Sequence, residues 1–135
     1  MNYSELIQLY FERTTALQNY WTLYVVIVGG LLAFSSLRKQ PAALTTLIVS
    51  LLFALFAFEN LGAIQDTATQ RMATLDAIKT SEGTASDVAR LRERLEPNLH
   101  PASLGSTRMT HLISDVLTIA ALWAMELRRR NAPRT

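Results

Sequence analysis

Cysteine is absent from this 135-residue chain, and charged side chains make up only 18% of it. Without cysteine there is no disulfide, no thiolate metal ligand and no thiol nucleophile. The formal net charge is only +2, so nucleic acid is not an expected partner. Few charges together with 50% hydrophobic residues are not typical of disordered segments or of most soluble domains. The length suits a single domain.

Catalytic motifs are also absent from the sequence. It contains no Gly-rich phosphate loop, no His-Glu-x-x-His run and no serine with evident catalytic partners. A bis-histidine haem would need both histidines, and His100 falls in a proline-containing loop. We therefore expect that the protein is not an enzyme and that it holds no cofactor or metal.

What the chain does contain is three apolar segments, each about the length that a helix needs to cross a hydrocarbon core of ~30 Å. The first has no charged residue, the second has only Glu59, and the third has Asp115 and Glu126. They predict an all-α integral membrane protein with three transmembrane helices in contact with the lipid bilayer. The segments are residues 20–37, 42–61 and 109–127.

Two other interpretations of these segments are weaker. Three buried helices of a soluble protein would need more chain to cover them than is present here. A signal peptide in the first segment would follow a basic region, whereas Glu5, Glu12 and Arg13 precede it.

Basic residues near the ends of the spans predict the orientation, because such residues favour the cytoplasmic side. With three spans, the link after the first segment and the tail at 128–135 lie on the same side. We therefore expect the N-terminus outside and the C-terminus inside, in a bacterial cytoplasmic membrane. The basic anchors are Arg38, Lys39, Arg128, Arg129 and Arg130.

The short link predicts that the first two spans form an antiparallel hairpin. Both helices are expected to continue outside the bilayer, as an arm at 1–19 and an extension within 62–108. Apolar residues in the extension recur every three or four positions. A short helix at 87–96 is expected to cover this stalk. The apolar positions are Leu61, Ile64, Ala68, Met72, Leu75 and Ile78.

The hairpin also predicts a register, with Asn19 opposite Asn60 and Arg13 opposite Asp66. Such an Arg13–Asp66 ion pair would be exposed, and exposed pairs contribute at most ~1 kcal/mol.

Polar residues of the spans converge on one depth, which makes them the candidate functional residues. His111 and Asp115 are four apart and share a helix face. Glu59 and Asn60 end the second span on the same side, where Gln18 and Asn19 begin the first. The cluster is interpreted either as a proton or cation site, with Glu59 as a possible third ligand, or as hydrogen bonds that hold the bundle together. Both interpretations stay open from sequence alone.

The first span carries two further features. Tyr20, Trp21 and Tyr24 suit an aromatic belt at the outer interface. Gly29, Gly30 and Ala33 form a small-residue face that allows close helix approach, more often within a subunit than between subunits.

Two functional hypotheses follow. The first is a structural or accessory membrane protein that acts through helix–helix contacts with itself or with another membrane protein. The alternative is a homo-oligomeric proton or cation channel that uses Glu59, Asn60, His111 and Asp115.

Overall fold

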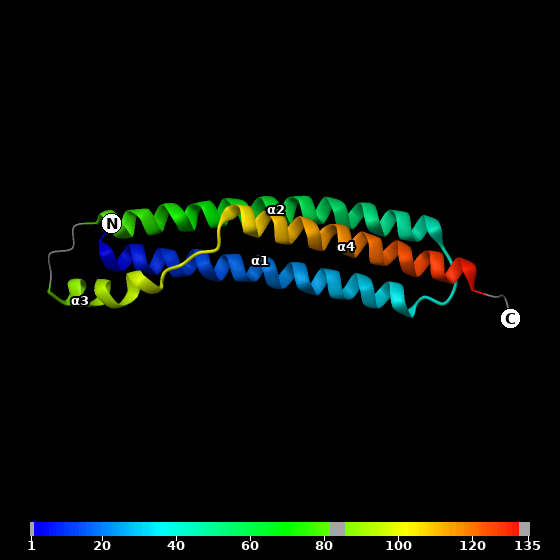
Figure 1. Ribbon diagram of the computed structural model, residues 1–135, viewed down its shortest axis with the longest axis horizontal. Coiled ribbons are helices and arrows are strands. Elements are labelled where there is room, and N and C mark those ends of the chain that lie inside the picture. The colour runs from blue at the N-terminus through cyan, green and yellow to red at the C-terminus, as the bar shows by residue number, and fades with distance from the viewer. Residues whose placement is uncertain (1, 82–85, 133–135) are drawn as a thin grey trace.

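The computed structural model describes the backbone of residues 2–81 and 86–132, and the side chains of all of these except 86–88. It is all-helical over these residues, which confirms the predicted fold class (Figure 1). α1 and α2 pack antiparallel, and α4 lies along both of them. The elements are α1 (Tyr3–Leu37), α2 (Ala43–Thr80), α3 (Ser86–Leu95), the 3-10 turn η1 (Glu96–Asn98) and α4 (Leu104–Asn131).

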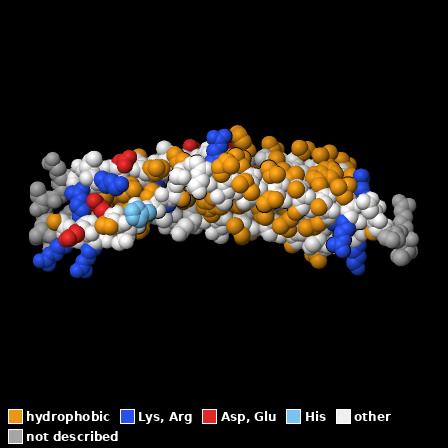
Figure 2. All heavy atoms as spheres, viewed as in Figure 1, with side chains coloured by type: hydrophobic (Ala, Val, Ile, Leu, Met, Phe, Trp, Pro, Cys, Tyr) orange, Lys and Arg blue, Asp and Glu red, His pale blue; other side chains and the backbone are white. Residues whose placement is uncertain are grey.

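Three of these helices, α1, α2 and α4, are long and apolar enough to cross a membrane. α1 has 35 residues and is therefore about 50 Å long, so the α1–α2 hairpin extends well beyond a ~30 Å hydrocarbon core. Large apolar side chains are exposed over the predicted spans, as in Leu44, Phe58 and Val116. Figure 2 shows them over the half of the molecule that α4 covers, with charged side chains at both ends. A surface of this kind suits lipid rather than water.

The buried face of α2 repeats with alternating steps of four and three residues along the whole helix. This is the 3.5-residue period of left-handed coiled-coil packing, and it explains why spans and stalk form one continuous hairpin. Where the helix lies in the predicted membrane, the buried positions are small or polar except for Phe53, which packs with Tyr24 and Ala57. The buried positions of α2 include Thr46, Ser50, Phe53, Ala57, Asn60, Ile64, Thr67, Arg71, Thr74 and Ile78.

The observed register of the hairpin differs from the predicted one by about two residues. Leu6 packs in one cluster with Leu75, and Leu17 packs with Ile64. Arg13 and Asp66 consequently form no ion pair among the described residues, and this expectation was wrong.

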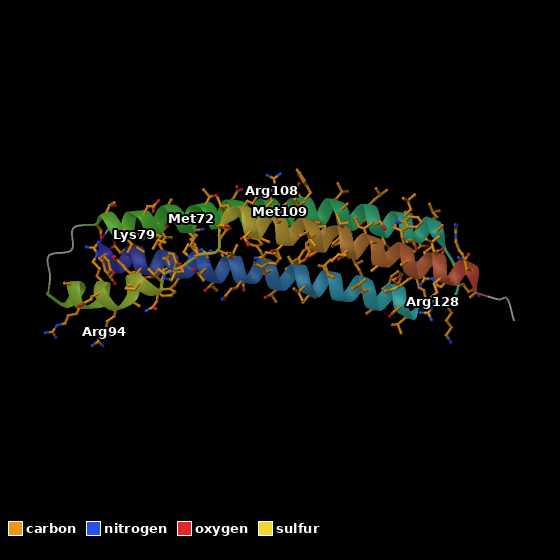
Figure 3. The ribbon with its side chains drawn as sticks, viewed as in Figure 1. Met72, Lys79, Arg94, Arg108, Met109 and Arg128 are labelled. Atoms are coloured by element: carbon orange, nitrogen blue, oxygen red, sulfur yellow. The ribbon has the colours of Figure 1, made fainter. Side chains whose placement is uncertain are left out.

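The same seam corrects one predicted core position in the stalk. Met72, labelled in Figure 3, is exposed, whereas its neighbour Arg71 is only 8% exposed. The 3.5-residue period of the buried positions of α2 includes residue 71. The prediction considered only the spacing of apolar residues and therefore placed Met72 in the core instead. The stalk therefore buries an arginine whose Nε has no hydrogen-bond partner among the described residues.

Replacing this buried cation should stabilise the stalk. We expect Arg71→Met to raise the free energy of unfolding by about 1 kcal/mol, because methionine has a similar length and needs no hydrogen-bond partner. Thermal unfolding of the full chain in detergent, followed by circular dichroism, measures the effect. Arg94→Met is the control, since Arg94 is exposed on α3, and it should change nothing. A loss of stability in Arg71→Met alone would mean that the guanidinium has a partner it needs.

α3 occupies Ser86–Leu95, close to the predicted helix, and Arg92 connects it to the stalk. One Arg92 nitrogen donates to the Ile78 carbonyl at 2.7 Å, at the end of α2, and the guanidinium lies over the Tyr3 ring at 5.5 Å. Burial raises the pKa of the Tyr3 hydroxyl. The expected covering helix is thus present and joins the ends of α1 and α2. Of the apolar residues of α3, Leu91 is 45% exposed, and Val88 lies outside the described side chains.

Candidate functional site: a buried polar network and a basic end

A chain of hydrogen bonds connects all three long helices at the depth predicted for the polar cluster. Tyr24 of α1 donates its hydroxyl to Asp115 Oδ1 at 2.8 Å. His111 Nδ1 lies 2.9 Å from Asp115 Oδ2, and His111 Nε2 lies 3.1 Å from Asn60 Oδ1. Asn60 donates its amide nitrogen to the Tyr20 carbonyl at 3.3 Å. His111 and Asn60 are both buried.

The orientation of Asn60 determines where the protons lie. Because its nitrogen donates to Tyr20, its oxygen faces His111 Nε2, which must therefore carry a hydrogen. Tyr24 already supplies the hydrogen for Asp115 Oδ1. One proton then remains between His111 Nδ1 and Asp115 Oδ2, and the pair has zero net charge wherever that proton resides.

Aromatic rings enclose the imidazole of His111. The Tyr24 ring centroid is 4.3 Å from that of His111, and the Trp21 centroid is 5.6 Å away. Both ring nitrogens of His111 have partners, and its side chain has no exposed surface. The arrangement can bind a proton between two side chains, and its hydrogen bonds fix the positions of the three helices relative to one another.

Of the four residues predicted to form a proton or cation site, the structure brings together Asn60, His111 and Asp115. Glu59 is exposed instead, and it lines a separate groove of about 270 Å³ together with Arg108. Figure 3 shows Arg108 at the start of α4, pointing away from the bundle. Within the described ranges no three His, Asp or Glu side chains are grouped as metal ligands would be.

Gln18 and Asn19, also expected in this cluster, are exposed on α1. Asn60 reaches the backbone of the following residue, Tyr20, rather than the Asn19 side chain. The two-residue difference in register accounts for this.

Tyr24 is the residue that sequence reasoning misplaced. It was expected in an interfacial belt, but it is 3% exposed and packs against Phe53 in the core. A signal was present, because the buried α1 residues Tyr3, Tyr10, Leu17 and Tyr24 recur every seven positions. That heptad spacing assigns Tyr24 to the helix seam.

A second polar cluster lies at the opposite end of the bundle, around Glu126. The carboxylate is fully buried, and Oε2 accepts from Arg129 and from the Thr46 hydroxyl, both at 3.1 Å. Arg38 lies 3.6 Å from the same oxygen, and Arg130 lies 3.6 Å from Oε1. Glu126 thus pairs with Arg129 and Arg130 of its own helix and with Arg38 of the hairpin link.

The predicted topology anchors divide into two groups at this end. Arg38 and Arg129 turn inward, where Arg38 donates to the Ala42 carbonyl at 3.1 Å and Arg129 to the Ser35 carbonyl at 2.7 Å. Lys39 and Arg128 are exposed. Figure 3 shows Arg128 at the C-terminal end of α4, beside the end of α1.

The small-residue face of α1 is not packed against α2 or α4. Gly29, Gly30 and Ala33 are all exposed, and a Cβ added at either glycine would meet no atom within 4 Å. Packing within the subunit therefore makes no use of this face.

Comparison of the chain with protein-family models, with curated proteins and with solved structures finds no match. Fold and site together define the chain as a small helical protein with three candidate membrane spans.

Proposed function

We propose that this chain is a structural membrane protein that associates with itself through α1. The observation that carries the proposal is a stripe along the exposed side of α1 whose residues, apart from Val26, are small or polar. Its members are all exposed and alternate in steps of four and three residues. The α1 stripe consists of Gln8, Glu12, Thr15, Asn19, Thr22, Val26, Gly29, Ala33 and Ser36.

The exposed faces of the other two spans have a different composition. α2 presents Leu44, Leu51 and Leu55, and α4 presents Val116 and Leu117, all large apolar residues suited to acyl chains. Small residues in a span instead let two helix backbones approach closely, and hydroxyls and amides hydrogen-bond across such contacts. The contrast between the faces favours a helix, rather than lipid, as the neighbour of α1.

The period of the α1 stripe favours a second copy of α1 as that neighbour. A 3.5-residue repeat sustained from Gln8 to Ser36 matches a parallel left-handed pair, which would extend through both membrane and stalk. In the stalk the stripe forms an open groove of about 630 Å³, lined in part by Phe11 and Ala16. Glu12, the one charged member, belongs to this part outside the predicted span, where water screens it.

The polar network supports a structural role over the alternative of a channel. His111 has no exposed surface, and each of its ring nitrogens already has a partner. A group that relays ions needs contact with water or with a mobile ion, whereas a satisfied network fixes the helices.

The proposed orientation places the basic end in the cytoplasm and the stalk outside. It is supported by the collection of Arg38, Lys39 and Arg128 at one end of the spans, while the stalk carries charges of both signs.

Self-association predicts that one added side chain on the α1 stripe separates the subunits. Gly29→Leu should weaken the dimer roughly tenfold, because a leucine prevents close approach of the helices. Gly29→Leu should not destabilise the fold of the monomer, since a Cβ at position 29 would have no atom within 4 Å. The measurement is the dimer fraction of the full chain in detergent, by light scattering across protein concentrations. The control Ala54→Leu makes a similar change on the exposed face of α2 and should leave the dimer unchanged.

Single cysteines test the same contact position by position, because the chain has no cysteine of its own. Oxidation in membranes should crosslink Thr15→Cys and Ala33→Cys into dimers, whereas Leu52→Cys on α2 should stay monomeric. A monomer at all concentrations, or equal crosslinking of all three variants, would overturn the proposal.

A further inference from the structure

The basic end of the bundle holds far more positive than negative charge. Between Arg13 and Phe58 the sequence has no acidic residue, and after Asp115 it has only Glu126. Against this one carboxylate stand the five basic residues of the link and the start of the tail. The basic end therefore carries an excess of positive charge that an anion could neutralise.

Only one oxygen of Glu126, Oε2, is occupied by the inward-facing cations, while Oε1 has no hydrogen bond among the described residues and lies 3.6 Å from Arg130. Its Oε2 accepts from Arg129 and Thr46, and Arg38 approaches the same oxygen. Lys39 and Arg128 have no ion pair or hydrogen bond among the described residues. In addition, the buried Nε of Arg129 has no acceptor there. Donors for an anion are therefore available in addition to those that Glu126 uses.

These free donors surround a cavity of about 400 Å³ between the ends of α1 and α4. Arg38, Lys39, Arg128 and Arg129 line it, together with the polar Ser36 and the apolar Met125. Arg129 also lines a second cavity of about 300 Å³ at the start of α2, where no side chain caps the helix. Four cations around one cavity match the charge and hydrogen-bonding needs of a phosphate group.

The position of the cavity indicates where the phosphate comes from. It lies at the ends of the candidate spans, which is the depth of lipid headgroups. Leucines at the same ends of the three helices are exposed, with Leu37 79%, Leu44 71% and Leu127 52% exposed. A phospholipid satisfies both features, because its phosphate meets the cations while its acyl chains cover the leucines.

We infer that the cavity between the ends of α1 and α4 is a binding site for the phosphate of an anionic phospholipid. Lys39 and Arg128 supply the free charges, while Arg38 and Arg129 are held in place by Glu126 and the backbone. The inference holds whether the protein is one copy or two.

Lipid retention by the purified full chain tests the inference. Native mass spectrometry in detergent measures how much phosphatidylglycerol or phosphatidylcholine stays bound. The double variant Lys39→Gln with Arg128→Gln should retain phosphatidylglycerol roughly tenfold more weakly than the wild type. The control double variant Arg94→Gln with Arg108→Gln removes the same charge from exposed positions elsewhere and should retain the lipid normally. Circular dichroism should show unchanged helix content in both.

Competition with inorganic phosphate separates the two sources of a phosphate group. Millimolar phosphate should leave phosphatidylglycerol bound, since the acyl chains add contacts that the free ion lacks. Displacement of the lipid by phosphate would overturn the lipid assignment in favour of a soluble phosphate. The site itself would be overturned if the wild type retained phosphatidylglycerol and phosphatidylcholine equally, or if both double variants lost phosphatidylglycerol to the same extent.

Discussion

Replacing Glu126 with alanine should lower the midpoint of thermal unfolding by roughly 10 °C, because it removes the carboxylate that pairs with Arg38, Arg129 and Arg130 at the basic end. Arg129 is 11% exposed at its side chain and would stay largely buried without a counterion. Thr46 would lose the acceptor of its hydroxyl as well. The measurement is thermal unfolding of the full chain in detergent by circular dichroism.

Two variants separate the charge of Glu126 from its shape. Glu126→Gln keeps the volume and one acceptor oxygen of the side chain. It should therefore lower the unfolding midpoint less than Glu126→Ala does, though more than the exposed control Glu93→Ala. The double variant Glu126→Leu with Arg129→Leu should be more stable than Glu126→Leu alone, because the less exposed of the two inward-facing cations is then not left unpaired. If the double variant is less stable than either single variant, the unpaired charge is not the source of the loss.

The fold could be predicted because its signals are local. A helix that crosses a membrane needs an uninterrupted apolar segment, and three such segments of sufficient length left little choice of fold class. The hairpin followed from the shortness of the link. Its register was less well predicted: the link spans residues 38–42, and α1 and α2 pair about two residues from the expected alignment.

The candidate site was predicted in part, for a physical reason. His111 and Asp115 belong to one helix, and their spacing of four is visible in the sequence. The contributions of Tyr24 and Arg38 depend on how separate helices are rotated, which hydropathy does not reveal. Only the seven-residue repeat of α1 carried that information for Tyr24.

Replacing Asp115 with leucine should destabilise the bundle by about 2–4 kcal/mol, the largest effect expected in the polar network. The change leaves two partners without hydrogen bonds, the hydroxyl of Tyr24 and Nδ1 of the fully buried His111. Asparagine at this position should behave differently. Its oxygen accepts from Tyr24, and its nitrogen donates to Nδ1 of a neutral imidazole, whose Nε2 still donates to Asn60. Asp115→Asn should therefore cost less than about 1 kcal/mol.

The contrast between the two Asp115 variants distinguishes a hydrogen-bonding role from a charged one. If an imidazolium–carboxylate ion pair were essential, asparagine would be nearly as damaging as leucine. Proton flux in liposomes completes the test, because a channel would conduct in the wild type and lose conduction in Asp115→Asn. We expect no flux from either protein, since His111 has no exposed surface and both of its ring nitrogens have partners, although the Asp115 side chain is 15% exposed. Wild-type flux that asparagine abolishes would instead make this pair the proton site of a channel.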